Sequence, residues 1–328
     1  MKRAAVPSIL VPVVLLTVAV IAEAQQPTKV PRIGYLAPTF PSSAPVRREA
    51  LRQGLRELGY VEGKNIVIEW RFAEDKADRL AGLAAELVRL KVEVIVTSGP
   101  AATRAAKEAT STIPIVMAQD NDPVGTGIVA SLARPGGNIT GLATLAPEIG
   151  GKRLELLKEV VPKLSRVSVL GTSTQPGIAQ QLKEVERTAG ALGVKLQFID
   201  VLSPKDIEVA FREAAKGRAG AVLTLTSPIL LSQRAQLAEL AVKNRLPAIY
   251  AQSEFVQDGG LMTYGPSIND LFRLAATYVD KILKGTKPSD LPIEQPKKFE
   301  FIINLNAAKQ IGLTIPPNVL ARADKVIK

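Results

Sequence analysis

The sequence predicts an α/β fold of two lobes, each built around a parallel sheet whose faces are covered by helices. Short apolar runs alternate with longer amphipathic segments along the chain, which is the pattern of repeated strand–helix units. The alternation forms two series of similar length, and the second series begins near Glu148. The connections are short, as expected for parallel sheets buried on both faces. At 328 residues the chain also exceeds the usual size of one domain.

In the first series, periodicity distinguishes the helices from the strands. Leu80, Leu83 and Leu87 share one face of a helix, whereas residues 92–97 form a continuous apolar run that is typical of a buried strand. We expect strands over residues 32–37, 65–71, 92–97, 113–117 and 139–142. We expect helices over residues 44–58, 76–90, 101–109 and 125–132.

The second series repeats this pattern without repeating the residues. We expect helices over residues 151–160, 177–192, 204–215, 230–244 and 268–283. We expect strands over residues 166–170, 195–201, 221–225, 248–250, 259–264 and 299–303, followed by a terminal helical segment.

The first residues have the composition of a secretory signal. Lys2 and Arg3 precede an almost wholly apolar stretch over residues 6–21, and Ala22-Glu23-Ala24 offers small residues at the positions that a signal peptidase reads. We expect residues 1–24 to be a signal peptide that is cleaved after Ala24. The alternative is a membrane anchor, but the stretch is short for a span and contains Pro12.

The absence of cysteine and histidine excludes several kinds of site. Disulfides, metal sites built on these residues, and Ser-His-Asp or Cys-His catalysis are impossible. Gln25 stands where a lipid-anchored exported protein would need a cysteine, so we expect retention in a periplasm behind an outer membrane. No phosphate-binding glycine loop, dinucleotide fingerprint or Gly-x-Ser-x-Gly motif is present. We expect no cofactor, no metal and no catalytic residue.

The formal net charge of +11 raises the possibility of nucleic-acid binding. However, the basic residues are dispersed along predicted helices beside glutamates, and no tract of Lys or Arg with interleaved aromatic residues occurs. We therefore expect a solvated basic surface and no nucleic-acid partner. The residues behind this interpretation are Arg47, Arg48, Arg52, Arg56, Lys152, Arg153 and Lys158.

Five strand-to-helix turns are rich in hydroxyl, amide and carboxylate groups. They cover residues 37–43, 97–101, 119–125, 224–228 and 250–254. Each turn alone is explained as a helix cap, but ligands of parallel sheets bind beyond the carboxyl ends of the strands, so five such turns favour a polar cleft. Asp120, Asp122, Glu254 and Asp258 could pair with a ligand ammonium or simply stabilise turns. Helix-end donors near a carboxylate suit a small polar or zwitterionic ligand such as an amino acid.

Several stretches resemble one protein family over essentially the whole mature chain. They include RIGYLAP, GLRELGYVEGKNIVIEWR, VIVTSGPAATRAAKEAT and DPVGTGIVASLARPGGNITG. These stretches resemble the ABC-transporter substrate-binding proteins related to the tryptophan/tyrosine-type binding proteins. The resemblance implies a type I periplasmic binding protein, with two Rossmann-like lobes joined by three hinge crossings. It also implies a first lobe of residues 30–144 plus about 266–288 and a second lobe of residues 145–265 plus about 289–328.

With this fold, the ligand is expected between the lobes, and its binding closes the hinge. In the first lobe we expect ligand contacts from Thr39, Ser98, Ala101 through its backbone N–H, and Asp120. In the second lobe we expect contacts from Thr226, Ser227, Tyr250 and Glu254. The resemblance implies a monomer that delivers its ligand to the permease and ATPase subunits of an inner-membrane importer.

Two other functions remain open at this point. A secreted α/β enzyme would need a pair of catalytic groups in the cleft, and Asp120 with Glu254 is the pair that the sequence offers. A sensory module would use the same ligand-binding fold to signal to a receptor or kinase.

Overall fold

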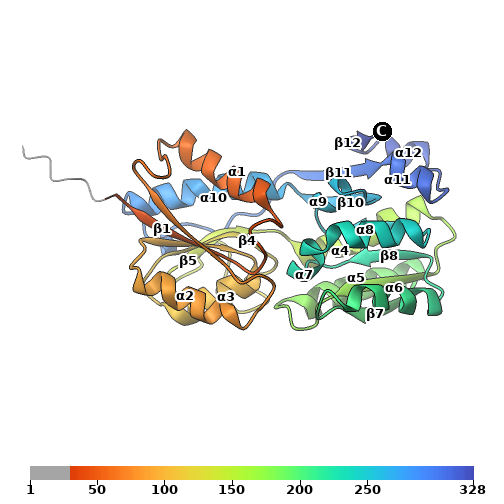
Figure 1. Cartoon of the computed structure of the whole chain (residues 1–328), viewed down its shortest axis with the longest axis horizontal. Coiled ribbons are helices and arrows are strands. Elements are labelled where there is room, and N and C mark those ends of the chain that lie inside the picture. The colour runs from red at the N-terminus through yellow and green to blue at the C-terminus, as the bar shows by residue number, and fades with distance from the viewer. Residues whose placement is uncertain (1–29) are drawn as a thin grey trace, which may run out of the picture. The chain divides into compact units, whose positions relative to one another are not determined.

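Strands from the first part of the chain form a five-stranded parallel sheet in a computed structural model, which describes residues 30–328. Its strands are β1 (Arg32–Ala37), β2 (Val67–Phe72), β3 (Val94–Ser98), β4 (Ile115–Asp120) and β5 (Ile139–Ala143). They follow the order β2-β1-β3-β4-β5, and Figure 1 labels β1, β4 and β5. This order creates a switch point between β1 and β3, where successive connections leave toward opposite faces of the sheet.

Helices cover both faces of this first sheet. They are α1 (Pro45–Glu57), α2 (Arg79–Arg89), α3 (Pro100–Ala109) and α10 (Ile268–Leu283). Ile33 and Tyr35 of β1 pack with α1 and α10, whereas Leu36 packs with α2 and α3, as the alternation of side chains along a strand requires. The helix α10, far away in the sequence, therefore completes the core of the first sheet (Figure 1).

The second sheet contains seven strands in the order β12-β11-β10-β9-β8-β6-β7. They are β6 (Arg166–Gly171), β7 (Lys195–Asp200), β8 (Ala221–Thr224), β9 (Ala248–Tyr250), β10 (Met262–Pro266), β11 (Phe299–Asn304) and β12 (Lys325–Ile327). The order from β7 to β10 repeats the winding of the first sheet, with the first strand of the series second from one end. The predicted two-lobed α/β architecture is thus confirmed.

Helices also cover both faces of the second sheet. They are α4 (Ala146–Val160), α5 (Ile178–Leu192), α6 (Asp206–Lys216), α7 (Pro228–Ser232), α8 (Arg234–Lys243), α9 (Glu254–Gln257), α11 (Leu305–Gln310) and α12 (Pro317–Leu320). One core contains α4, α5, α11 and α12, and the other contains α6 to α9. A short 3-10 helix, Pro288–Asp290, lies in the connection between α10 and β11.

The expectation of wholly parallel sheets is wrong at one edge of the second sheet, where β11 and β12 run opposite to the other strands. β11 pairs antiparallel with β10, with Tyr264 opposite Phe301. Between these strands the chain passes through α10, which packs on the first sheet, and then returns to the second sheet. A chain that leaves along β10 and returns by a direct path must run along β11 in the opposite direction.

Two predicted helices differ from the observed structure. Residues 125–132 form turns, because Asp122 Oδ1 accepts a hydrogen bond from the Gly125 N–H and Gly127 has a φ of 72°, which a right-handed helix cannot contain. The predicted helix over 230–244 is divided at Gln233 into α7 and α8. The short elements α9 and β12 were not predicted.

The path of the chain matters for the positions of the site residues. Residues 31–328 form one compact unit, within which β5 leads into α4 and β10 leads into α10. The boundaries expected for the two lobes stay predictions. No helix within residues 30–328 has the length and apolar character needed to cross a bilayer. The expected signal peptide, residues 1–24, lies outside the described residues.

A test of this packing uses the contact between α1 and α10. A Cβ atom on Gly54 would lie 2.4 Å from the backbone oxygen of Arg273 and 2.8 Å from Cβ of Ala276, so α1 can approach α10 only with glycine there. We expect Gly54→Ala to lower the free energy of unfolding by about 1–3 kcal/mol. Gly82 on α2 has open space at the same atom, so Gly82→Ala should raise stability by up to about 1 kcal/mol. Urea unfolding measures both, and a stabilised Gly54→Ala protein would contradict the helix contact.

Candidate functional site

The carboxyl ends of strands from both sheets surround two adjoining pockets that share the side chains of Gln119, Thr226 and Gln252. We call them the Arg153 pocket and the Ser98 pocket, and together the cleft. The space not filled by atoms, which is partly open to solvent, is about 270 Å³ in the Arg153 pocket and about 330 Å³ in the Ser98 pocket.

The Ser98 pocket is formed where β1, β3 and β8 end. Its lining residues are Pro38, Thr39, Arg47, Ser98, Gly99, Pro100, Gln119, Gln175, Thr226, Ser227, Pro228, Leu231 and Gln252. Gly99 precedes α3 with a φ of 94°, which permits the sharp turn from β3 into the helix. Ala101 does not line the pocket, although its neighbours Gly99 and Pro100 do. The structure thus brings Thr39, Ser98, Thr226 and Ser227 together.

Ser227 has a structural task as well as a place in the lining. Its hydroxyl oxygen accepts a hydrogen bond from the Leu230 N–H and caps α7. The same hydroxyl lies 2.6 Å from Oγ1 of Thr172. Both contacts restrict its availability to a ligand, whereas the half-buried Thr226 borders both pockets.

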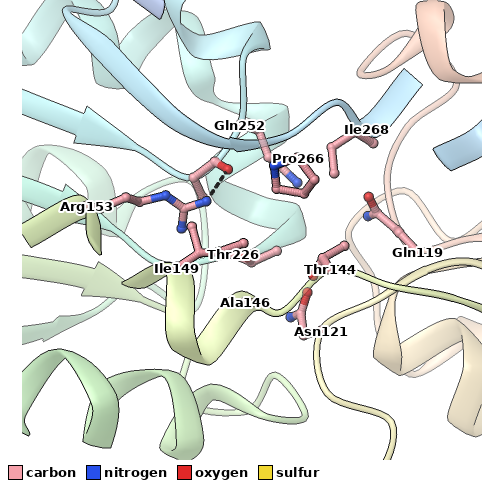
Figure 2. A pocket seen from close by; sticks show the side chains of 11 residues that line it. Gln119, Asn121, Thr144, Ala146, Ile149, Arg153, Thr226, Gln252, Pro266 and Ile268 are labelled. Carbon is pink, nitrogen blue, oxygen red and sulfur yellow. Dashed lines mark hydrogen bonds between the residues drawn. The ribbon is translucent and has the colours of Figure 1, made fainter. Parts of the chain in front are cut away.

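The Arg153 pocket combines polar groups with an apolar wall (Figure 2). Its lining residues are Gln119, Asn121, Thr144, Ala146, Ile149, Arg153, Thr226, Ala251, Gln252, Pro266 and Ile268. Figure 2 shows Arg153 on one side and Gln119 and Asn121 on the other, with Ile149 and Pro266 near the space between them. Polar atoms that protein groups leave without a hydrogen bond here include Gln119 Oε1 and Arg153 Nη1.

Asp120 lies behind this pocket and not in its lining. It is fully buried, while its neighbours Gln119 and Asn121 line the pocket. The Thr144 N–H and hydroxyl donate hydrogen bonds to the Asp120 backbone oxygen, which ties β4 to the segment leading into α4. Burial raises the pKa of the Asp120 carboxyl to about 7, and the nearby Thr103 hydroxyl offsets only part of that effect.

Tyr250 and Glu254 also lie beside the cleft without lining it. The Tyr250 ring is buried and stacks on Phe255, with 4.8 Å between the ring centroids. Arg47 Nε donates a hydrogen bond of 2.7 Å to Oε1 of Glu254, and Arg47 itself lines the Ser98 pocket. Burial opposes ionisation of Glu254, but the Arg47 and Arg234 guanidinium groups hold its pKa below the usual value. This ion pair joins α1 of the first sheet to α9 of the second.

A comparison with known families decides the kind of protein. Residues 41–327 match the family model for ABC transporter substrate binding proteins. The chain belongs to this family. Its members bind substrates for a transporter, so the enzyme alternative is wrong. Accordingly, the nominated catalytic pair, Asp120 and Glu254, consists of a fully buried carboxyl and a carboxylate already paired with Arg47.

Three proteins are similar to this substrate-binding protein in sequence or structure. A tyrosine-binding protein of Clostridioides difficile (strain R20291) is 25% identical over 261 residues, 80% of this chain and 75% of that protein. A conserved domain protein of Vibrio cholerae O1 biovar El Tor, solved by crystallography, has a TM-score of 0.86 and 28% identity, covering 91% of this chain and 100% of its own. An ABC domain from Streptococcus pneumoniae, solved in complex with L-Trp, has a TM-score of 0.84 and 25% identity, covering 90% and 99%.

The expectation of a solvated basic surface is wrong for two arginines of this binding protein, which are buried. Arg47 and Arg153 are each only 2% exposed. The sequence did contain a signal for both. Arg153 stands four residues from Ile149 and Leu157, and Arg47 four residues before Leu51, so each arginine lies on the apolar stripe of its helix.

Four further polar lining residues that were not predicted are amides. They are Gln119, Asn121, Gln175 and Gln252. Three of them lie inside the predicted polar turns, where carboxylates and hydroxyls were preferred as candidates.

Within residues 30–328 no group of three or more acidic side chains is arranged to hold a metal ion.

The raised pKa of Asp120 predicts a pH effect on stability. The folded protein holds the Asp120 proton up to about pH 7, whereas an unfolded aspartate releases it near its ordinary pKa of about 3.9. Folding therefore binds a proton in this window, and this contribution to stability is lost as the pH rises. We expect the stability of the wild type relative to Asp120→Asn to fall between about pH 4 and pH 7, by at most about 1.4 kcal/mol per pH unit. Urea unfolding across this range measures it, and parallel curves for the two proteins would show that Asp120 ionises normally.

Proposed function

We propose that this protein is the extracytoplasmic solute-binding component of an ABC importer and that it binds an amino acid in the cleft. The observation that carries the proposal is the cleft itself, where side chains from two separate sheets meet and leave buried polar atoms without protein partners. Buried polar groups are normally hydrogen-bonded, so such a group of free donors and acceptors is suited to a polar ligand.

The chemistry of the lining supports an amino acid with an apolar side chain. The guanidinium of Arg153 can receive a carboxylate, and the free Oε1 of Gln119 can accept a hydrogen bond from a donor. Ile149, Pro266 and Ile268 offer apolar surface in the same pocket. The tyrosine-binding relative and the relative solved with L-Trp support an aromatic amino acid as the first ligand to test.

Closure of the cleft around the ligand is supported by contacts that already cross it. Besides the Arg47–Glu254 pair, Nη1 of Arg234 donates a hydrogen bond of 2.9 Å to the backbone oxygen of Ser43. The Ser232 hydroxyl lies 3.0 Å from the Ser43 hydroxyl and donates a hydrogen bond to Asp75. These contacts exist only while the two sides are close together, and a ligand that touches both sides adds to the same closed state.

Transport requires partners outside this chain. The expected signal peptide would export the protein to a periplasm, where a monomer in the closed state would be recognised by the permease and ATPase subunits of the importer. The family membership supports delivery to a transporter.

A screen of amino acids tests this function. A ligand that binds only the folded protein raises the free energy of unfolding by about 2.7 kcal/mol at a concentration of 100 times its Kd. We expect L-tyrosine or L-tryptophan to raise the melting temperature more than glycine or glucose does, with one-to-one binding in calorimetry. A protein that binds none of the twenty amino acids would contradict the proposal.

The same titration locates the site. Ser98→Ala and Thr226→Ala should each weaken binding about tenfold, since each removes a hydroxyl that lines the cleft, and neither should unfold the protein. Thr314→Ala, an exposed position outside the cleft, serves as the matched control and should bind like the wild type. Unchanged affinity in both cleft variants would move the site elsewhere.

A further inference from the structure

Arg153 is held rigidly at the wall of its pocket. Nε donates a hydrogen bond of 2.7 Å to the backbone oxygen of Tyr264, and Nη2 donates one of 2.7 Å to the backbone oxygen of Ala251. Figure 2 shows the second of these bonds as a dashed line. A Cβ atom on Gly265 would lie 3.1 Å from Nη2, so the glycine leaves room for the guanidinium beside β10. The group is thus fixed in one orientation before any ligand binds.

The remaining nitrogen and the positive charge have no counterpart within residues 30–328. Nη1 is buried and forms no hydrogen bond, and no carboxylate within residues 30–328 makes an ion pair with Arg153. Burial lowers the pKa of Arg153 to about 9, which still leaves the group charged at neutral pH. A buried charge without a partner is strongly unfavourable, and an anion bound in the pocket would remove that cost.

The rest of the lining defines which anion fits. Arg153 is the one cationic side chain among the residues that line its pocket, and the others are amide, hydroxyl or apolar. The other buried arginine of the cleft, Arg47, is already neutralised by Glu254. One fixed guanidinium beside apolar surface matches a single negative charge on an organic molecule, which is a carboxylate, better than a phosphate with its higher charge.

We propose that Arg153 determines specificity by binding the carboxylate of the ligand through Nη1, so that the protein selects free amino acids over their uncharged derivatives. This proposal rests on the proposed function, because it assigns one half of the amino acid to one residue of the Arg153 pocket. Without the ligand, the two bonds to backbone oxygens make Arg153 a tether between α4 and the ends of β9 and β10.

Calorimetry with paired ligands separates these two roles. L-Tyrosine and L-tyrosinamide, and L-tryptophan and L-tryptophanamide, differ at the group that Arg153 would bind, which is a carboxylate in the acid and a neutral carboxamide in the amide. We expect the wild type to bind the acids at least about 100-fold more tightly than the amides. Arg153→Met should weaken binding of the acids by about 100-fold and reduce the preference over the amides to less than about fivefold.

Lys158→Met is the matched control for loss of a tether. Lys158 lies on the same helix and also donates to a backbone oxygen, that of Leu164, but it does not line the cleft. It should keep the full preference for acids. Circular dichroism checks that each variant is folded. If Arg153→Met is unfolded, the comparison of acid with amide in the wild type decides alone. Arg153→Lys keeps the charge and should retain part of the preference for acids over amides.

The outcomes distinguish the two proposals. Equal binding of acid and amide by the wild type, or an equal loss of both in Arg153→Met, would leave the amino-acid function standing and overturn the role of Arg153. A wild type that binds no amino acid would overturn both.

Discussion

The structure depends on polar groups at the ends of the two sheets and on the helices beside them, which neither side of the cleft satisfies alone. The strands that end at the cleft deliver hydroxyls and amides there, and α1 and α4 add the guanidinium groups of Arg47 and Arg153. Some of these groups find partners across the cleft, as Arg47 finds Glu254. Others, such as Arg153 Nη1 and Gln119 Oε1, find none. Because unsatisfied buried groups are unfavourable, the incomplete part of this network defines where a ligand adds stability.

The two buried arginines differ in how their positive charges are compensated. Arg47 is paired with a carboxylate of the other side, and this pair favours the close approach of α1 and α9. Arg153 is oriented by two backbone oxygens but has no counter-ion in the part of the chain that the structure describes. In the function proposed here, the first arginine holds the cleft together and the second selects what enters it. A closed state that is favoured by the Arg47–Glu254 pair and by the ligand bound to Arg153 gives a transporter a single shape to recognise.

Much of the fold could be predicted from periodicity. The strand β3 is a continuous buried run, and α10 was predicted with its observed bounds, because its apolar stripe and polar face are clear. The direction of β11 could not be predicted, since it depends on the route of the chain through α10. The turn over residues 125–132 was mistaken for a helix, because Gly127 acts through its positive φ and not through its hydropathy.

The position of the candidate site was predicted better than its side chains. The polar turns after β1, β3, β4, β8 and β9 all contribute lining residues to the cleft. The register of β4 shifts near its end, and the twist there decides whether Gln119, Asp120 or Asn121 faces the pocket. No pattern in the sequence predicts this orientation. The buried arginines were hidden by the high overall charge, although their helical spacing marked them.

The most direct test is the distance between the two sheets with and without ligand. The chain has no cysteine, so spin labels can be attached at Glu108→Cys on α3 and Glu208→Cys on α6, both exposed. Pulsed electron spin resonance would then measure the separation of the labels while an amino acid is added to saturation. A ligand that joins both sides of the cleft predicts a shift from a broad distribution to one narrow distance. An unchanged distribution at full occupancy would contradict it.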